Sequence, residues 1–304
     1  MSTSTKIEWT RGDDGSAGAT WNAVTGCTEV PEGCDHCYAR TFAERWRGVP
    51  GHPFTQGFDV RLWPDRLSKP LSWRKPRRVF VNSMSDLFHD RIPTEFIARV
   101  FATMALSSRH TYMVLTKRAA RMRTVLSSGD FREAVAEHAT DTIGNTPPHL
   151  GGWRLDLGGH RLAGDSGHGG GWTVTPTPHG HLWSPPWPLP NVWIGVSVET
   201  QKWADIRIPH LARTPAAVRF LSCEPLLGPI DLSAADVDWV IAGGESGPGA
   251  RPMHPDWARS LRDRCQAAKV PFFFKQWGGR TPTANGRELD GRTWDDHPRT
   301  GGRP

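Results

Sequence analysis

Short, continuously apolar runs recur along the chain, and segments with helical spacing lie between them. The clearest runs are Arg78–Ser83, Thr111–Thr116 and Asn191–Val198, in which apolar residues occupy successive positions instead of alternate ones. Strands of this composition are typical of a parallel sheet that helices cover. The other expected strands are Ala19–Thr25, Ala217–Ser222, Asp238–Gly243 and Val270–Lys275. Six to seven such strand–helix units predict an α/β fold, namely a full or partial parallel (β/α) barrel.

The barrel is expected over residues 19–279, with an insertion at 141–190. That insertion is rich in Gly, His, Pro and Trp, and its histidines are irregularly spaced. We therefore expect a flexible segment on one face of the barrel and no metal site in it. Residues 1–18 and 280–304 are polar and rich in Gly, and both are predicted to be flexible. The helices are expected at Tyr38–Trp46, Pro93–Leu106, from Lys117, Lys202–Ala212 and Pro255–Ala268.

Composition and the start of the chain limit where the protein works. Apolar residues make up 37% and charged residues 22%, as in a soluble globular protein. No stretch approaches the roughly 20 apolar residues that span a bilayer. The first residues also lack the apolar core of a secretory signal. We expect a cytoplasmic protein without a membrane partner, and its net charge of +6 is compatible with a polyanionic one.

Three of the five cysteines, Cys27, Cys34 and Cys37, lie within eleven residues. In a reducing compartment such clustering favours metal ligation over disulfides. Thiolates are soft, strong ligands, and three without an obvious fourth leave one metal position open. A four-iron cluster with one open iron fits this set. The alternative is a structural zinc site, for which His36 would be a geometrically poor fourth ligand.

The cysteine loop resembles that of the radical S-adenosylmethionine superfamily. The common spacing there is Cys-x-x-x-Cys-x-x-Cys, whereas this chain has Cys-x6-Cys-x-x-Cys. Over residues 6–125 and 190–279 the chain is similar to one group, the phage-associated three-cysteine-motif family of unknown function. The motifs that recur there in the same order are Trp21–Cys27, Asn82–His89, Leu115–Arg118, Gly195–Glu199, Cys223–Ile230, Gly243–Gly247 and Phe274–Gly278. The order of the strand-end motifs is also similar, more loosely, to the spore photoproduct lyase branch.

The resemblance implies a radical S-adenosylmethionine enzyme. Cys27, Cys34 and Cys37 would hold a [4Fe-4S] cluster whose open iron binds S-adenosylmethionine. A reductant would supply the electron that cleaves this cofactor, and the resulting radical would abstract hydrogen from an unknown substrate, which could be a nucleobase or nucleotide. The alternative is a non-catalytic, zinc-bearing nucleic-acid-binding protein, in which the cysteines only hold a loop in place.

Polar residues follow the carboxyl ends of most expected strands, where a parallel barrel has its active site. The candidates for binding the cofactor are Ser83, Ser85, Asp86, Lys117, Ser197, Glu199, Gly243, Gly244 and Glu245. The resemblance implies that Asp86 accepts a hydrogen bond from the cofactor's amino group and that Glu199 binds a ribose hydroxyl. Each could instead cap the following turn or helix. The Gly243–Glu245 segment could let the backbone approach the cofactor or could form a tight turn, and Lys117 could complement a carboxylate or be solvated.

Cys223 is the candidate catalytic residue, as a hydrogen-atom donor to a substrate radical or a reversible fourth ligand. Its alternative role is that of a small buried hydrophobe, which free cysteine often is. Cys265 lies in a helical pattern and is expected in the core.

The run Arg61–Arg78 combines seven basic residues with Trp63 and Trp73. Such a mixture could bind nucleic acid through phosphate contacts and base stacking. The alternative is a solvated face whose Trp rings pack inward.

Overall fold

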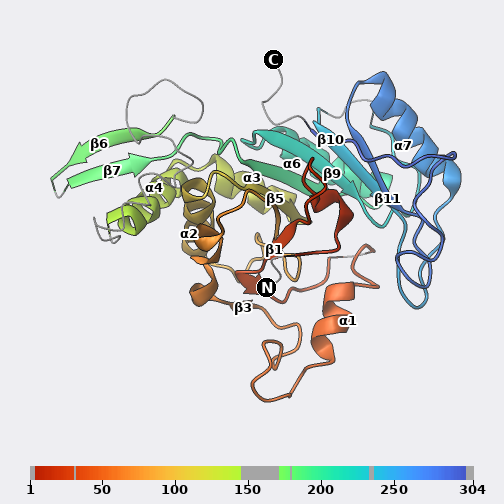
Figure 1. Ribbon diagram of the computed structural model, residues 1–304, viewed down its shortest axis with the longest axis horizontal. Helices are drawn as coiled ribbons and strands as arrows, with labels where there is room; N and C mark the ends of the chain where they lie inside the picture. Colours follow the sequence, from red (N-terminus) through yellow and green to blue (C-terminus); the bar gives the residue numbers. More distant parts are fainter. Residues whose placement is uncertain (1–3, 31, 145–170, 179, 233–235, 299–304) are drawn as a thin grey trace.

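The computed structural model describes residues 4–30, 32–144, 171–178, 180–232 and 236–298. Seven parallel strands form one sheet in the order β1-β4-β5-β8-β9-β10-β11. Their bounds are β1 Ala19–Trp21, β4 Arg78–Val81, β5 Thr111–Thr116, β8 Val192–Ser197, β9 Val218–Cys223, β10 Trp239–Gly243 and β11 Phe272–Gln276. The sheet is curled into a half-barrel, with α2 and α4 toward one end and α7 toward the other (Figure 1). The predicted partial parallel barrel is confirmed.

Helices connect most successive strands. They are α2 Thr94–Leu106, α3 Ala119–Ser127, α4 Gly129–Gly144, α6 Gln201–Ala212 and α7 Pro255–Ala267. In α2, buried residues such as Ile97, Phe101 and Met104 recur at helical spacing and face the sheet. Within the described ranges, no helix combines the length and the apolar character that crossing a bilayer requires.

Two short antiparallel strand pairs lie outside the main sheet. β2 (Val24–Thr25) pairs antiparallel with β3 (Arg61–Leu62), and β6 (Thr173–Thr177) pairs antiparallel with β7 (Gly180–Ser184). The β6–β7 pair belongs to the predicted insertion, of which residues 145–170 lie outside the described part of the chain. The remaining short elements are α1 (Tyr38–Glu44) and the 3-10 helices η1 (Glu8–Thr10), η2 (Pro64–Arg66) and η3 (Lys69–Ser72).

The two faces of the sheet are buried in different ways. On one face, residues such as Val79 and Val114 pack against the helices. On the other face, residues such as Phe80 and Met113 join a cluster that also includes Trp9 of η1 and that, within the described residues, contains no side chain of an α-helix. Successive side chains of a strand point to opposite faces of the sheet, so each continuous apolar run contributes buried side chains to both faces.

Both terminal segments contribute to the face without helices. Trp9 is 2% exposed and packs against Phe80 and Trp239. His297 packs against the same Trp239 and lies 3.2 Å from the Trp9 carbonyl oxygen. The flexibility predicted for residues 1–18 and 280–304 stays a prediction, but both segments carry side chains that cover the sheet.

Candidate functional site

The cysteine loop, residues 26–37, leaves β2 at the carboxyl edge of the main sheet and leads into α1. It begins at Gly26, which forms a bridge with Ser85, four residues after the end of β4. Gly26 has a φ of +85°, and a Cβ there would lie 2.1 Å from the Asp59 carbonyl oxygen, so only glycine fits. The loop ends at Cys37, the residue directly before α1, whose carbonyl oxygen accepts from the Thr41 N–H in the first turn. The loop is therefore fixed at both ends.

Two of the three sulfur atoms of this loop, those of Cys27 and Cys34, accept hydrogen bonds from other residues of the chain. Arg118 Nη1 donates to Cys27 Sγ over 3.5 Å, and the backbone N–H of Val30 donates to Cys34 Sγ over 3.4 Å. Donors of this kind stabilise a thiolate and tune iron–sulfur centres. Burial raises the pKa of Cys27 to about 11 and also raises the pKa of Cys34. Without a metal these two thiols keep their protons at neutral pH, and metal binding would release them.

A single metal ion needs at least three protein ligands close together. Among the residues that the structure describes, no three His, Cys, Asp or Glu side chains gather closely enough to hold one. His36, the candidate fourth zinc ligand, has its Nδ1 2.8 Å from Glu245 Oε2. A four-iron cluster binds each thiolate through a different iron, so its ligands stand farther apart than those of one ion. Three partly exposed thiols with N–H donors on two of the sulfurs are a donor set that fits such a cluster.

Arg118 ties the loop to the ends of two strands. Its Nη1 also donates to Asp86 Oδ2 over 3.2 Å, and its Nη2 donates to both oxygens of Thr28 over 3.0 and 3.1 Å. Thr28 Oγ1 in turn lies 2.8 Å from His89 Nε2. Since Arg118 follows β5 and Asp86 follows β4, one guanidinium holds two neighbouring strand ends and the first part of the loop together.

Asp86 is 6% exposed and is surrounded by donors from the chain itself. Oδ1 accepts from Phe88 N–H at 2.9 Å and from Thr116 Oγ1 at 2.7 Å. Oδ2 accepts from Lys117 N–H at 3.0 Å and from Arg118. These are the contacts of the turn-capping alternative, and with four donors in place little capacity remains for a ligand's amino group.

Glu199 lies fully buried between two cations, with Oε1 2.8 Å from Lys117 Nζ and Oε2 2.8 Å from Arg207 Nη1. The same Arg207 Nη1 donates to the carbonyl oxygen of Ser197, which is 3% exposed. Gly33 packs directly on this carboxylate, since a Cβ there would lie 2.2 Å from Oε1. Buried charges persist only when each has a partner. Glu199 therefore fixes both cations and supports the middle of the cysteine loop.

Glu245, two residues after the end of β10, is held by Arg251. Oε2 accepts from the Arg251 backbone N–H at 2.9 Å and from Nε at 3.0 Å, and Oε1 accepts from Nη2 at 2.6 Å. Arg251 also reaches the loop, with Nη1 3.1 Å from Asp35 Oδ2 and Nη2 3.0 Å from the Glu32 carbonyl oxygen. Burial opposes ionisation of Glu245, but hydrogen bonds from Arg251 and His36 outweigh it and lower the pKa to about 2.

Glu224, directly after β9, pairs with Lys275 on β11, and its Oε1 lies 2.8 Å from Lys275 Nζ. Gly243 stands beside this pair, because a Cβ there would lie 3.4 Å from both Glu224 Oε1 and Lys275 Cβ. Gly244 permits a close approach of two chain segments, since a Cβ would lie 2.0 Å from the Trp277 carbonyl oxygen. Close packing at the strand ends therefore requires glycine at 244, whereas a Cβ at 243 would make ordinary van der Waals contact.

The two predicted serines after β4 bind the segment that follows β1. Ser83 shares a hydrogen bond of 3.3 Å with Asn22, and its carbonyl oxygen accepts from Tyr38 Oη at 2.6 Å. Ser85 Oγ donates to the Val24 carbonyl oxygen over 3.0 Å. Their side-chain contacts position the beginning of the cysteine loop.

The structure thus brings the predicted carboxylates Asp86, Glu199 and Glu245 to the edge that carries the cysteine loop. Cys223 is placed differently: it is fully buried in the cluster between sheet and helices, where Cys265 also packs. Burial raises its pKa well above the ordinary value. Such an environment favours the alternative given above for Cys223, namely that it is a small buried hydrophobic residue of the core.

Tyr38, Arg207 and Arg251 also belong to this edge, although none of them was among the candidates from the sequence. Arg207 looks like one more polar residue of an amphipathic helix, and Arg251 lies in an irregular segment before α7. Of these three residues, only Tyr38 could have been recognised from the sequence, because it directly follows the third cysteine.

The basic run splits into exposed and structural residues. Arg74 and Lys75 are exposed. Arg78 is 6% exposed and pairs with Asp13 Oδ1 at 2.6 Å. The Trp63 ring has the guanidinium carbons of Arg61 and Arg66 at 3.9 and 3.7 Å from its centroid. Trp73 is partly buried and packs against the core. The inward-packed alternative therefore describes Trp73, and arginines cover Trp63.

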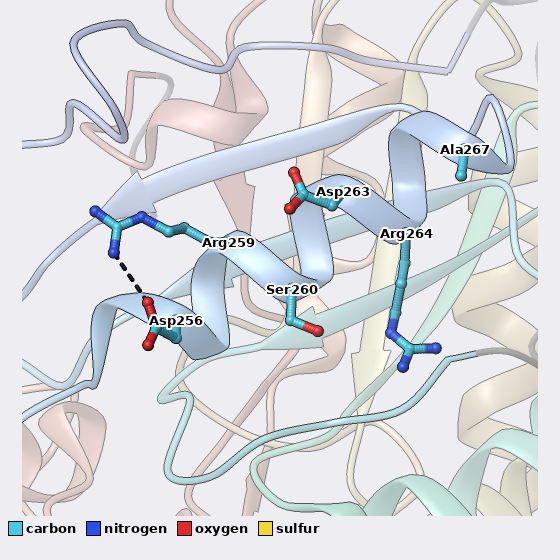
Figure 2. Close-up of a pocket in the computed structure, with 6 residues that line it drawn as sticks. All are labelled: Asp256, Arg259, Ser260, Asp263, Arg264 and Ala267. Carbon is cyan, nitrogen blue, oxygen red and sulfur yellow. Dashed lines mark hydrogen bonds and ion pairs between the residues drawn. The ribbon is translucent and has the colours of Figure 1, made fainter.

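Figure 2 shows a shallow pocket along α7. It is lined by Asp256, Arg259, Ser260, Asp263, Arg264 and Ala267. The side of α7 that packs on the sheet carries Ala258, Leu261 and Cys265, so the pocket lies on the outer side. Its charges pair locally, for instance Arg259 with Asp256 at 3.0 Å. It is a solvated helix face and not a second candidate site.

Comparison with known proteins identifies one family. The family described as "Protein of unknown function (DUF5131)" matches residues 4–298. No curated protein matches the sequence. Among solved structures, spore photoproduct lyase complexed with dinucleoside spore photoproduct aligns with a TM-score of 0.38 and 9% identity, over 80% of this chain and 59% of that one. The chain thus spans 59% of the lyase's length, and a similarity at this score carries no functional argument.

Proposed function

The chain belongs to the DUF5131 family of proteins of unknown function, and we propose that it is a radical S-adenosylmethionine enzyme. Cys27, Cys34 and Cys37 would hold a [4Fe-4S] cluster, and S-adenosylmethionine would bind its open iron. The observation that carries the proposal is the cysteine loop itself, whose first sulfur accepts from Arg118 at the carboxyl edge of a parallel half-barrel. When bound, the cluster supplies the electron that cleaves the cofactor's sulfonium C–S bond and yields a radical able to abstract hydrogen.

Two lysines at this edge are suited to orient the cofactor. The Lys117 side chain is 18% exposed and pairs with the Glu199 carboxylate, and the Lys275 side chain is 28% exposed and pairs with the Glu224 carboxylate. An ammonium group has three donors, so each lysine keeps donors for a ligand's carboxylate. We assign the cofactor's methionyl carboxylate to one of these two lysines.

In the proposal, Asp86 and Glu199 act as positioning residues and do not contact the cofactor. Asp86 orients Arg118 toward the Cys27 sulfur. Glu199 orients Lys117 and supports the loop at Gly33. A preorganised set of charges of this kind keeps its geometry while the reaction proceeds, which is how a protein stabilises charge at low cost.

The substrate class that we propose is a nucleobase or nucleotide, supported by the net charge of +6. A cytoplasmic location belongs to the same proposal, because the three partly exposed thiols would be reduced there.

Anaerobic reconstitution tests the proposed function. The purified chain is treated with iron and sulfide, and its iron, sulfide and zinc contents are measured beside its visible absorption. We expect about four irons and a broad thiolate-to-iron band, and a change in the paramagnetic resonance spectrum of the reduced cluster when S-adenosylmethionine is added. Stoichiometric zinc without iron uptake would reject the proposal in favour of the zinc-bearing nucleic-acid-binding alternative.

A further inference from the structure

An exposed aromatic stripe begins at the residue after Cys37. It consists of Tyr38, Phe42 and Trp46, which are 60%, 44% and 36% exposed. They are spaced four residues apart, so they lie along one side of α1 and its extension. The opposite side carries Ala39 and Ala43, which are buried. Figure 1 shows α1 standing out from the half-barrel. Contiguous exposed aromatic rings on a folded protein mark an interaction surface.

The rings of the stripe are held in place by one another and by the following loop. His52 stacks on Trp46 with ring centroids 4.0 Å apart and an interplanar angle of 16°. Phe42 meets the edge of Phe54 at 5.7 Å. One face of Trp46 is therefore already covered. A base-stacking platform needs open ring faces, so the stripe is poorly suited to single-stranded nucleic acid.

Charges of both signs surround the stripe. Arg40 pairs with Glu29, and Arg47 pairs with Glu44 at 2.6 Å and with Asp59 at 3.2 Å. Carboxylates among the arginines would repel a run of phosphates. An aromatic centre with a polar rim of mixed charge is instead typical of a protein–protein interface.

We propose that the aromatic stripe is the docking surface for a small electron-carrier protein. This inference rests on the proposed function, because the carrier would deliver one electron to a cluster held by Cys37 and its partners. The carrier loses one electron, the oxidised cluster gains it, and no atom or proton needs to be transferred. Tyr38 directly follows Cys37, and the seven residues of α1 extend over only about 10 Å. A protein seated on the stripe therefore lies close to the cluster ligands.

The size and charge of the surface suit such a partner. Redox encounters between proteins bury small interfaces, below about 1,200 Å² in total. Such an encounter needs only a few aromatic anchors, which carry most of the binding energy at an interface. The rim carries arginines paired with carboxylates, which suits a carrier whose own contact surface has charges of both signs, and exposed Arg45 adds one positive charge beside the rings.

The experiment uses reconstituted protein, with reduced flavodoxin as the protein electron donor and dithionite as the small one. Cluster reduction is followed by stopped-flow absorption for the parent chain and for the double variant Phe42→Ser/Trp46→Ser. Ile206→Ser is the matched control, because Ile206 is also an exposed large apolar residue, 47% exposed, but lies on α6. Calorimetric titration with oxidised flavodoxin measures the binding affinity in the absence of electron transfer.

We expect the double variant to lose at least about tenfold in the rate constant with flavodoxin, the equivalent of about 1.4 kcal/mol of lost binding. Its rate with dithionite and its iron content should match those of Ile206→Ser. Equal flavodoxin rates in all three chains would overturn the docking proposal, and so would loss of oligonucleotide binding in the double variant alone. If the chain takes up no iron, the proposed function is wrong. If the chain binds iron but the double variant binds flavodoxin as well as the parent does, only the proposed docking surface is wrong.

Discussion

Arg118 donates to the sulfur of Cys27 over 3.5 Å, with Asp86 holding the same guanidinium nitrogen at 3.2 Å. An exposed arginine loses most of its electrostatic influence to solvent, but the Arg118 side chain is only 12% exposed. Its charge therefore acts on the cysteine loop with little screening. Arg118 is the residue through which the half-barrel most directly influences the electronic properties of a cluster.

Replacing Arg118 with Gln should lower the reduction potential of the cluster, because a positive charge beside a thiolate ligand favours the reduced, more negative form. A unit charge about 4 Å away, acting through an effective dielectric constant of about 20, changes the energy by about 4 kcal/mol, which for one electron is a shift on the order of 150–200 mV. Redox titration followed by paramagnetic resonance measures it. Arg118→Lys should recover part of the shift, and Arg123→Gln on the same helix should leave the potential unchanged. An unchanged potential in Arg118→Gln would contradict this role.

Replacing Cys27, Cys34 or Cys37 singly with Ala should abolish iron uptake, since three thiolates are the smallest set that holds such a cluster. Cys265→Ala serves as the control. Its thiol is buried in the core, and burial raises its pKa to about 12, so iron uptake should persist while thermal stability falls slightly. Iron and sulfide analysis after anaerobic reconstitution gives the result. Iron uptake that survives loss of any one loop cysteine would show that another residue supplies a ligand.

Glu245→Gln should reduce stability at neutral pH by up to about 3 kcal/mol, because the carboxylate pKa is about 2 in the folded chain against an ordinary 4.5. A lowered pKa means that the contribution is present above about pH 4.5 and is lost as the pH falls toward 2. The difference in unfolding free energy between the parent and Glu245→Gln should therefore shrink over that range. Urea unfolding at pH 7 and at lower pH measures it. A difference that does not change with pH would mean that Glu245 contributes no ionic stabilisation.

Glu199→Gln should destabilise the chain by about 3–5 kcal/mol, because it leaves Lys117 and Arg207 without their shared buried counter-charge. Lys117→Met in the same background should restore part of this loss, since it removes one of the two uncompensated charges. Denaturant unfolding of the single and double variants forms the necessary cycle. A Glu199→Gln chain as stable as the parent would show that solvent already compensates these charges.

The fold could be predicted because it depends on local pattern. Apolar runs such as Thr111–Thr116 are continuous, and a parallel sheet under helices is the arrangement that buries them. α4 was not recognised, because its buried residues Phe131, Val135 and Ala139 are few and stand among polar ones. Its helical character depends on packing against α2, which the sequence does not display.

The candidate site could be predicted only in part. The cysteines and strand-end carboxylates stand out because their chemistry is unusual at those positions. Their partners do not: Arg251 lies 219 residues from Glu32, whose carbonyl oxygen it binds. Contacts between such distant residues follow from how the strand ends meet, and an arginine that is solvated looks the same in the sequence as one that is buried.

The basic run Arg61–Arg78 contains both solvated and buried basic side chains. Replacing the exposed Arg74 and Lys75 together with Gln should flatten the salt dependence of any nucleic-acid binding. Each lost phosphate contact changes the slope by about 0.9 on duplex DNA and about 0.7 on single strands. Arg78→Gln should instead lower thermal stability, because the guanidinium is buried, pairs with Asp13 and donates to the Arg11 carbonyl oxygen.

Gel-shift titrations at several salt concentrations, run beside thermal melts, separate the two effects. The double variant should keep the parent's melting temperature, and Arg78→Gln should keep the parent's salt slope at a temperature where it is folded. Trp63→Ala should behave like Arg78→Gln, because Arg61 and Arg66 cover its ring and its Nε1 donates to Thr25 Oγ1 over 2.9 Å. A Trp63→Ala chain that melts like the parent but binds single strands roughly 1–3 kcal/mol more weakly would mean that a base displaces an arginine from the ring.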